Sequence, residues 1–295
     1  MTKNPFIYHS LALLTLLSPL AAAAPPFRVV IDPGHGGSDL GTTTDLGKTS
    51  ITEKDVTLSL ALEASRLLKS AGVETYLTRY DDKEIELGNR TAFANKIGAS
   101  VFISLHMNSS QSHLDESAMG IITQVKLGTK KLPPAEGIET YILNNTTDAS
   151  SKRLAHLENS VLGGKPQDGT STDVALIIKD LRIDSNLPKS KRLACAVQTE
   201  LVLATSKGKS KKDLVKRNRG IKQALFHVLL GADMPSVLVE VGFLSSPADR
   251  SFIMTKENRH LLAVALADGI LEYAGLKKSS VPHFNPNTCQ VREQP

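Results

Sequence analysis

The stretch that most constrains the fold is Val-Val-Ile-Asp-Pro-Gly-His-Gly-Gly, residues 29–37. Its β-branched start predicts a buried strand, which must end where Pro33 removes a backbone donor and glycines allow a tight turn. His35 therefore follows the carboxyl end of a strand, at the edge where open α/β sheets place their ligand sites. A lone histidine in a turn is more often structural, so the rest of the chain must decide its role.

Strand-like and helix-like segments alternate along the chain, which predicts an α/β fold with a central, mostly parallel sheet flanked by helices. The expected strands are residues 27–32, 73–78, 99–108, 120–125, 226–230 and 236–241. One helix is expected to follow residues 51–55 and to stop at Gly72, and another is expected to start at Ser246. The other expected helices are residues 87–97, 136–143, 151–162, 174–181, 190–205 and 258–274.

The charge of the chain is mildly basic, with a formal net charge of +5 and a pI near 9.1 over 295 residues. A net positive charge favours binding to an acidic polymer or an anionic surface. Nucleic acid is not expected as a partner, because no binding motif is present and aromatic residues make up only 4% of the chain.

The first residues have the pattern of a secretory signal peptide, with a charged start, a short apolar core from Leu11 and a run of alanines at 21–24. We expect cleavage after Ala23, and hence a signal peptide over residues 1–23. The apolar run is too short for a transmembrane helix, so no membrane span is expected after cleavage. An uncleaved membrane anchor is the alternative.

Between residues 134 and 191 the sequence becomes polar, which predicts a long insertion in one α/β domain. Residues 206–216 form a basic loop, and residues 277–295 have the composition of a disordered tail. Cys195 lies in an apolar helical pattern and Cys289 in the tail, and the sequence does not require a bridge between them.

Three residues form a candidate metal set. His35 and His106 each end a buried strand, and Glu53 opens the first long helix. Two imidazoles and one carboxylate are a typical zinc set that leaves the fourth position open for water. We therefore expect Zn²⁺ as the cofactor.

Glu240 is an acid inside the apolar strand Val-Leu-Val-Glu-Val. A buried carboxylate is costly unless it has a partner or a task. General-base catalysis is one such task, since burial raises the pKa toward the working range. Pairing with an arginine in the core is the alternative.

Several motifs, in order, resemble those of the zinc-dependent N-acetylmuramoyl-L-alanine amidases, in particular the secreted enzymes that separate daughter cells. They are the stretch 29–37, Thr-Glu-Lys-Asp at 52–55, Arg79, Leu-Gly-Asn-Arg at 87–90, Ser-Leu-His-Met-Asn at 104–108, and Val-Leu-Val-Glu-Val-Gly-Phe at 237–243. The resemblance runs from about Phe27 to Ala274 and implies a catalytic domain over residues 27–276 with a six-stranded sheet.

The resemblance also implies roles for single residues. His35, Glu53 and His106 would hold the zinc, and Glu240 would be the catalytic acid and base. The reaction would be hydrolysis of the amide between the lactyl group of N-acetylmuramic acid and L-alanine in peptidoglycan. Asn108 and Arg219 lie in matching motifs and would face the substrate.

Division amidases of Gram-negative bacteria carry a helical insertion that blocks the zinc site, and a Glu-Asn pair on it is similar to Glu158-Asn159. By this resemblance, Glu158 would occupy the open zinc position at rest, in the periplasm. An activator with a coiled coil and a LytM domain would then displace the insertion, and residues 174–181 would be its docking helix. A surface position for Glu158 is the alternative.

The chain departs from many family members, because we find no N-terminal β-rich targeting domain and no C-terminal wall-binding repeats. A zinc peptidase that cuts within the peptide and a non-catalytic wall-binding protein remain competing interpretations. His113, His156, His227 and His260 match no motif and are not expected to be ligands.

Overall fold

The computed structural model describes residues 26–47, 50–109, 135–160, 169–206 and 217–277, and for residues 169–185 only the backbone. The predicted signal peptide, the predicted strand at 120–125, His113, Cys289 and the predicted tail from residue 278 lie outside these ranges. No helix within them has the length and apolarity needed to cross a membrane.

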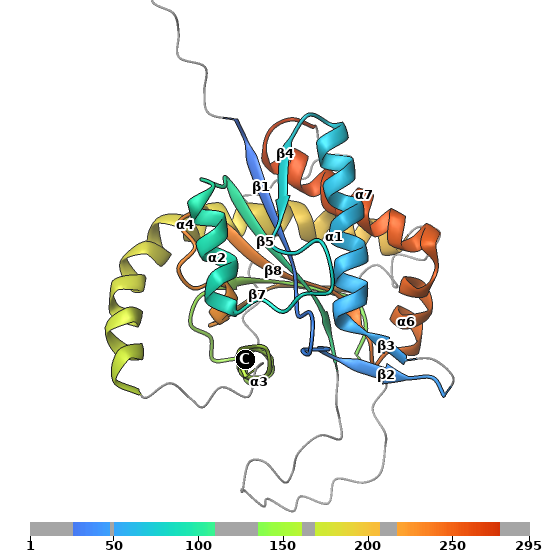
Figure 1. Cartoon of the computed structure of the whole chain (residues 1–295), viewed down its shortest axis with the longest axis horizontal. Coiled ribbons are helices and arrows are strands. Elements are labelled where there is room, and N and C mark those ends of the chain that lie inside the picture. Colours follow the sequence, from blue (N-terminus) through green and yellow to red (C-terminus); the bar gives the residue numbers. More distant parts are fainter. Residues whose placement is uncertain (1–25, 48–49, 110–134, 161–168, 207–216, 278–295) are drawn as a thin grey trace, which may run out of the picture.

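A six-stranded sheet forms the centre of the molecule, as predicted, with the strand order β4-β1-β5-β8-β6-β7 (Figure 1). Four of its five pairings are parallel, and the antiparallel one joins β6 to β8. The strands are β1 (Arg28–Pro33), β4 (Glu74–Leu77), β5 (Val101–Asn108), β6 (Ile138–Leu143), β7 (Asn218–Ala224) and β8 (Ser236–Phe243).

Helices cover both faces of the sheet, because the strands carry apolar side chains on both faces. One core layer packs β1, β5 and β8 against α1 (Glu53–Ser70), α4 (Gly169–Ser206) and α7 (Lys256–Tyr273). The layer on the other face includes residues of α2 (Leu87–Lys96), α3 (Ala149–Asn159) and the 3₁₀ helix η1 (His227–Leu229). The helix α6 (Pro247–Met254) begins after Ser246, whose side chain caps it.

The fold corrects three sequence predictions between residues 136 and 230. Residues 136–143, expected as a helix, form β6 between β8 and β7. Gly137 has φ 108°, which a right-handed helix does not allow, and the segment then reads Ile-Glu-Thr-Tyr-Ile-Leu, rich in strand formers. The predicted insertion over 134–191 is therefore too wide at its start, because β6 belongs to the central sheet.

The second correction concerns the strand expected at 226–230, where the chain forms η1 instead. The strand is β7, just upstream, with the polar sequence Asn-Arg-Gly-Ile-Lys-Gln-Ala at the edge of the sheet. The third concerns the helices expected at 174–181 and 190–205, which are one helix, α4, with Pro188 inside it. A short hairpin of β2 (Thr43–Asp45) and β3 (Ser50–Thr52) precedes α1 and was not predicted.

Candidate metal centre and active site

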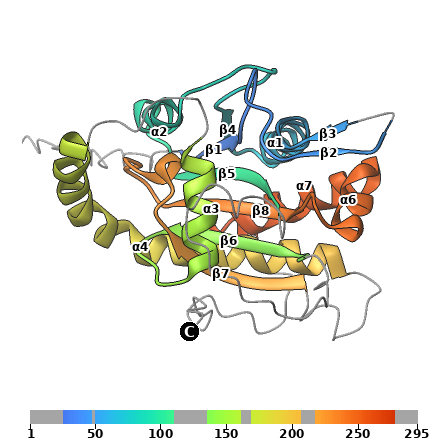
Figure 2. The ribbon, with the colours of Figure 1, turned by 90° about the horizontal axis from the view of Figure 1, so that it is seen from below.

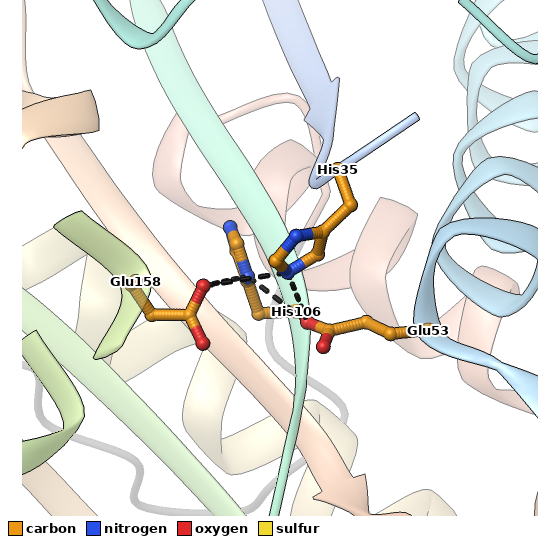
Figure 3. Close-up of side chains that lie close together, drawn as sticks. All are labelled: His35, Glu53, His106 and Glu158. Atoms are coloured by element: carbon orange, nitrogen blue, oxygen red, sulfur yellow. Dashed lines mark hydrogen bonds and ion pairs between the residues drawn. The ribbon is translucent and has the colours of Figure 1, made fainter. Parts of the chain in front are cut away.

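Four side chains meet at one edge of the sheet: His35, Glu53, His106 and Glu158 (Figure 3). They come from the loop after β1, the first residue of α1, β5 and the last turn of α3. One donor atom from each lies within 4.8 Å of all the others. The structure thus brings the three predicted ligands together and adds Glu158 as a fourth group.

The distances within this group are short. Nε2 of His35 is 3.0 Å from Oε1 of Glu53 and 3.3 Å from Oε2 of Glu158. Nδ1 of His106 is 3.0 Å from each of the same two oxygens. Donors bound at about 2.0–2.1 Å to one tetrahedral ion would be about 3.3 Å apart, so the spacing suits a small cation.

Backbone conformation aims His35 at this point. The residue has φ 60°, in the left-handed region that non-glycine residues seldom adopt. Arg79 and Arg90 hold the loop in place by donating hydrogen bonds to the carbonyl oxygens of Pro33, Gly34 and His35. Both guanidinium groups are buried. They supply hydrogen bonds to backbone carbonyl groups of the turn, which need partners because they lie away from water.

Asp32 balances the charge of Arg90 beneath the loop. Its Oδ1 accepts from Nη1 of Arg90 at 2.8 Å, and its Oδ2 accepts from the Ser104 hydroxyl at 2.7 Å. Burial would raise the pKa of Asp32, but Arg90 and the hydroxyl donors outweigh it and hold the pKa below its ordinary value of 3.8.

Replacing Asp32 with asparagine is expected to lower the free energy of unfolding by about 3 kcal/mol at pH 7, because Arg90 would stay buried without its counterion. A lowered pKa stabilises the fold above the ordinary carboxyl pKa, and this contribution is lost as pH falls through the folded-state value. The difference in the free energy of unfolding between the wild-type protein and Asp32→Asn should therefore disappear in acid. Urea unfolding at several pH values measures this, with Asp45→Asn on exposed β2 as the control. An equal difference at all pH values would contradict the account.

Two glycines leave room for the ligand side chains. A Cβ on Gly34 would lie 2.6 Å from the His106 ring, and one on Gly41 would lie 2.6 Å from the His35 ring and 2.7 Å from Oε2 of Glu53. All three distances are shorter than real Cβ contacts, so these positions exclude side chains, and glycine allows the His35 and His106 rings to reach the site.

Hydrogen bonds from the surrounding chain orient the ligands. Nδ1 of His35 lies 2.8 Å from Oδ2 of Asp39, which leaves Nε2 for the shared point. The two oxygens of Glu53 accept from the backbone N–H groups of Thr42 and Met107, each at 2.8 Å. Such outer partners fix ring and carboxylate orientation in metal sites.

Without an ion, the electrostatics of the group are those of two imidazoles among carboxylates. Burial lowers the pKa of His106, but Glu158 and Glu53 outweigh it and raise the pKa to about 10. The pKa of His35 is raised in the same way, against burial, by Glu53, Asp39 and Glu158. Metal binding would therefore have to displace protons from this site.

Two buried atoms support the fit of a cation. Nε2 of His35 and Oε2 of Glu158 make no hydrogen bond of good geometry with the described protein. Both belong to the group that converges on one point, and buried polar atoms without hydrogen bonds are rare unless a ligand completes them. Two imidazole nitrogens and carboxylate oxygens are donors that suit zinc.

Glu240 lies beside this group with its side chain fully buried. It is the register partner of His106 on the neighbouring strand, so the two side chains share one face of the sheet. Neither carboxyl oxygen has a hydrogen-bond partner within the described chain, and no arginine pairs with it. Burial raises the pKa of Glu240 well above the ordinary carboxyl value. The core-acid alternative, which required an arginine partner, is therefore not supported.

Asn108 and Arg219, the two expected substrate-facing residues, meet at a residue that sequence analysis missed, Glu139 in β6. Nδ2 of Asn108 donates to Oε2 of Glu139 at 3.0 Å, and Nε of Arg219 donates to Oε1. Nζ of Lys222 also donates to Oε1, at 2.8 Å. No short motif points to Glu139, because these three partners come from other strands.

Glu158 lies in the site because its neighbour fixes α3. Nδ2 of Asn159 donates to the Leu225 carbonyl at 2.9 Å, and the N–H of His227 donates to Oδ1 of Asn159 at 2.7 Å. In Figure 2, α3 lies in front of the middle strands. From α3, Glu158 reaches His106 of β5, as Figure 3 shows. Of the histidines not expected as ligands, His156, His227 and His260 are absent from the metal-binding group.

Fold and site together define an α/β protein with two histidines and two glutamates, placed where they could hold a metal ion, at one edge of a mostly parallel sheet. A family comparison narrows this class. The model of the N-acetylmuramoyl-L-alanine amidase family matches residues 29–272, and the chain belongs to this family.

Individual relatives agree with this assignment. The chain is similar to N-acetylmuramoyl-L-alanine amidase AmiC of Neisseria meningitidis serogroup B, at 32% identity over 250 residues, 83% of this chain and 52% of that protein. AmiA of Escherichia coli K12 is 29% identical over 251 residues, 83% of this chain and 75% of that protein. The chain thus spans about half the length of the first relative and three quarters of the second.

Among solved structures, an N-acetylmuramoyl-L-alanine amidase from Clostridium difficile 630 matches with a TM-score of 0.58 at 27% identity, over 86% of this chain and 100% of that one. The amidase AmiC2 of Nostoc punctiforme matches with a TM-score of 0.54 at 27% identity, over 84% of this chain and 97% of that one. These matches support the predicted α/β architecture.

Proposed function

We propose that the protein is a zinc-dependent peptidoglycan amidase that hydrolyses the bond between the lactyl group of N-acetylmuramic acid and L-alanine. The observation that carries this proposal is Glu240, a buried carboxyl without a hydrogen-bond partner next to His106 of the metal-binding group. Membership of the amidase family supports the choice of substrate.

His35, Glu53 and His106 would hold the zinc ion, and their orientation by Asp39, Thr42 and Met107 supports this role. When bound, zinc would act as a Lewis acid that polarises the lactyl carbonyl. Glu240 takes a proton from the attacking water and returns it to the alanine nitrogen as the amide breaks. Burial raises the pKa of Glu240, which makes its carboxylate a stronger proton acceptor than an exposed one.

The position of Glu158 supports the proposal that the described conformation is a resting state. Its carboxylate lies 3.0 Å from Nδ1 of His106 and 3.3 Å from Nε2 of His35, where it completes a four-donor set and leaves no open position. Substrate can enter only after α3 moves. We infer that the insertion, from the end of β6 into α4, is autoinhibitory and that an activator displaces it.

Replacing Glu158 with alanine is expected to raise the rate of peptide release at least about tenfold, because the blocking carboxylate is removed while its helix remains. Purified peptidoglycan sacculi are the substrate, and new L-alanine amines are measured with and without a zinc chelator. Glu257→Ala, an exposed acid at the start of α7, is the matched control. Equal activity of Glu158→Ala and the wild type would contradict autoinhibition. Cleavage within the peptide would indicate a peptidase.

The cellular setting that we propose is cell-wall remodelling and separation of daughter cells. The signal-peptide pattern of residues 1–23 supports secretion, and the periplasm is the compartment expected for an amidase of the division type. The proposed partner is a coiled-coil activator with a LytM domain. Residues 174–181, within α4, are its expected docking site.

A further inference from the structure

Glu139 accepts hydrogen bonds from residues of three strands at the edge of the proposed active site. Its carboxylate is buried and accepts from Asn108 of β5, from Lys222 and Arg219 of β7, and from the hydroxyl of Tyr141, the last at 2.8 Å. Burial would raise the pKa of Glu139, but Lys222 and Arg219 outweigh it and lower the pKa, so the group carries a negative charge. This anion fixes the base of the Arg219 guanidinium.

A β-bulge places Arg219 at this point. Ile138 pairs with Asn218 and Glu139 pairs with Gly220, so Arg219 is an extra residue in β7 with no register partner on β6. Bulges redirect a side chain and occur often beside active sites. The redirected guanidinium carbon lies 5.1 Å from the centre of the Phe243 ring, so the ring supports it as well.

The outer edge of Arg219 is left open by these contacts. Its Nε is used by Glu139, whereas Nη1 and Nη2 donate to no group among the residues that the structure describes. The side chain is 32% exposed. A guanidinium held at its base and supported by a ring presents two parallel donors, the geometry that binds a carboxylate in a bidentate manner.

The position of this edge relative to the catalytic residues can be read from the sheet register. His106 pairs with Glu240, and two residues further along β5, Asn108 pairs with Phe243. Two residues of a strand span about 6.6 Å. An extended peptide covers the same distance in two residues. A ligand group next to Phe243 therefore belongs to a residue close to the bond that is cut.

We propose that Arg219 binds a carboxylate of the peptidoglycan stem peptide, carried by its second or third residue, with Glu139 and Phe243 as positioning residues. The inference rests on the proposed amidase function. The peptide is the expected source of the carboxylate, because the lactyl carboxyl of the glycan is consumed in the amide bond. The site would favour peptides with that carboxylate free over peptides with it amidated.

The test measures binding of soluble muropeptides to the Glu158→Ala/Glu240→Gln protein, in which we expect an open site and turnover too slow to consume the ligand during the measurement. Three muropeptides are compared: one with both carboxylates free, one amidated at the second residue and one amidated at the third. We expect one of the two amidations to weaken binding about tenfold or more, the typical effect of losing a charge-assisted pair. Arg219→Met should reduce this discrimination to less than twofold.

The matched control is Arg28→Met. Arg28 is also one-third exposed and bonded to a glutamate, Glu74, but it opens β1 at the opposite end of that strand from the His35 loop. Glu139→Gln tests positioning: it should lower the discrimination without weakening the binding of the amidated muropeptides. A change in fold alone would weaken binding of all three.

The proposal is overturned if neither amidation weakens binding, or if Arg219→Met discriminates as well as its parent or no worse than Arg28→Met. Hydrolysis of sacculi by Glu158→Ala is assayed in parallel. Failure to release the stem peptide there contradicts the amidase function, whereas the binding comparison decides the role of Arg219 by itself.

Discussion

Replacing Glu240 with glutamine is expected to lower kcat by about 10²–10⁴-fold, the usual range for a lost general acid or base. Glutamine keeps the size and shape of the side chain but cannot accept or deliver the proton. Glutamine is also uncharged, so it avoids the cost of an ionised carboxylate that is buried without a hydrogen-bond partner. We therefore expect the free energy of unfolding to stay the same or to rise.

The assay is release of stem peptide from sacculi in the Glu158→Ala background, together with the zinc content of each variant. The zinc content should not change, because Glu240 is not in the metal-binding group. A variant that keeps its activity would show that another residue handles the proton. A variant that loses zinc and activity together would make Glu240 a structural support of the metal site.

The second large effect is expected from replacing His35 with asparagine. Asparagine tolerates the left-handed conformation that this position requires, so the glycine loop can keep its path. The variant lacks the imidazole nitrogen that points at Glu53 and Glu158. We expect zinc affinity to fall at least about 100-fold and hydrolysis to be lost with it.

Zinc affinity is measured by competition with a chromophoric chelator, and folding by urea unfolding of the metal-free protein. His260→Asn is the control, since that exposed histidine bonds to Glu63 of α1 and does not belong to the group of His35, Glu53, His106 and Glu158. Unchanged zinc affinity in His35→Asn would remove His35 from the ligand set.

The residues that could be predicted are those whose signal is local. His35 and His106 stand where apolar runs end, Glu53 opens a helix, and Glu240 interrupts an apolar strand. Each pattern reflects a physical cost, either of ending a buried strand or of burying a charge, and that cost is visible in a few neighbouring letters.

The residues that could not be predicted depend on partners far away in the sequence. Glu139 is an acid buried in β6, and donors such as Lys222 and Asn108, from other strands, make its burial tolerable. The role of Arg219 follows from one extra residue in the pairing of β7 with β6, which no pattern within β7 reveals. Tertiary contacts therefore decided the polar strand β7 against its local preference.

The strand order of the central sheet also determines how late in synthesis the fold can be completed. β8 lies between β5 and β6, although it follows both in the chain. Until β8 is in place, the two halves of the sheet have no strand to join them, so much of the assembly must await long-range pairing, which is slow. The strand that joins the halves also carries Glu240. An incomplete chain therefore lacks both its finished sheet and its proposed proton-transfer group, and the proposed wall-degrading activity could arise only after synthesis has passed this strand.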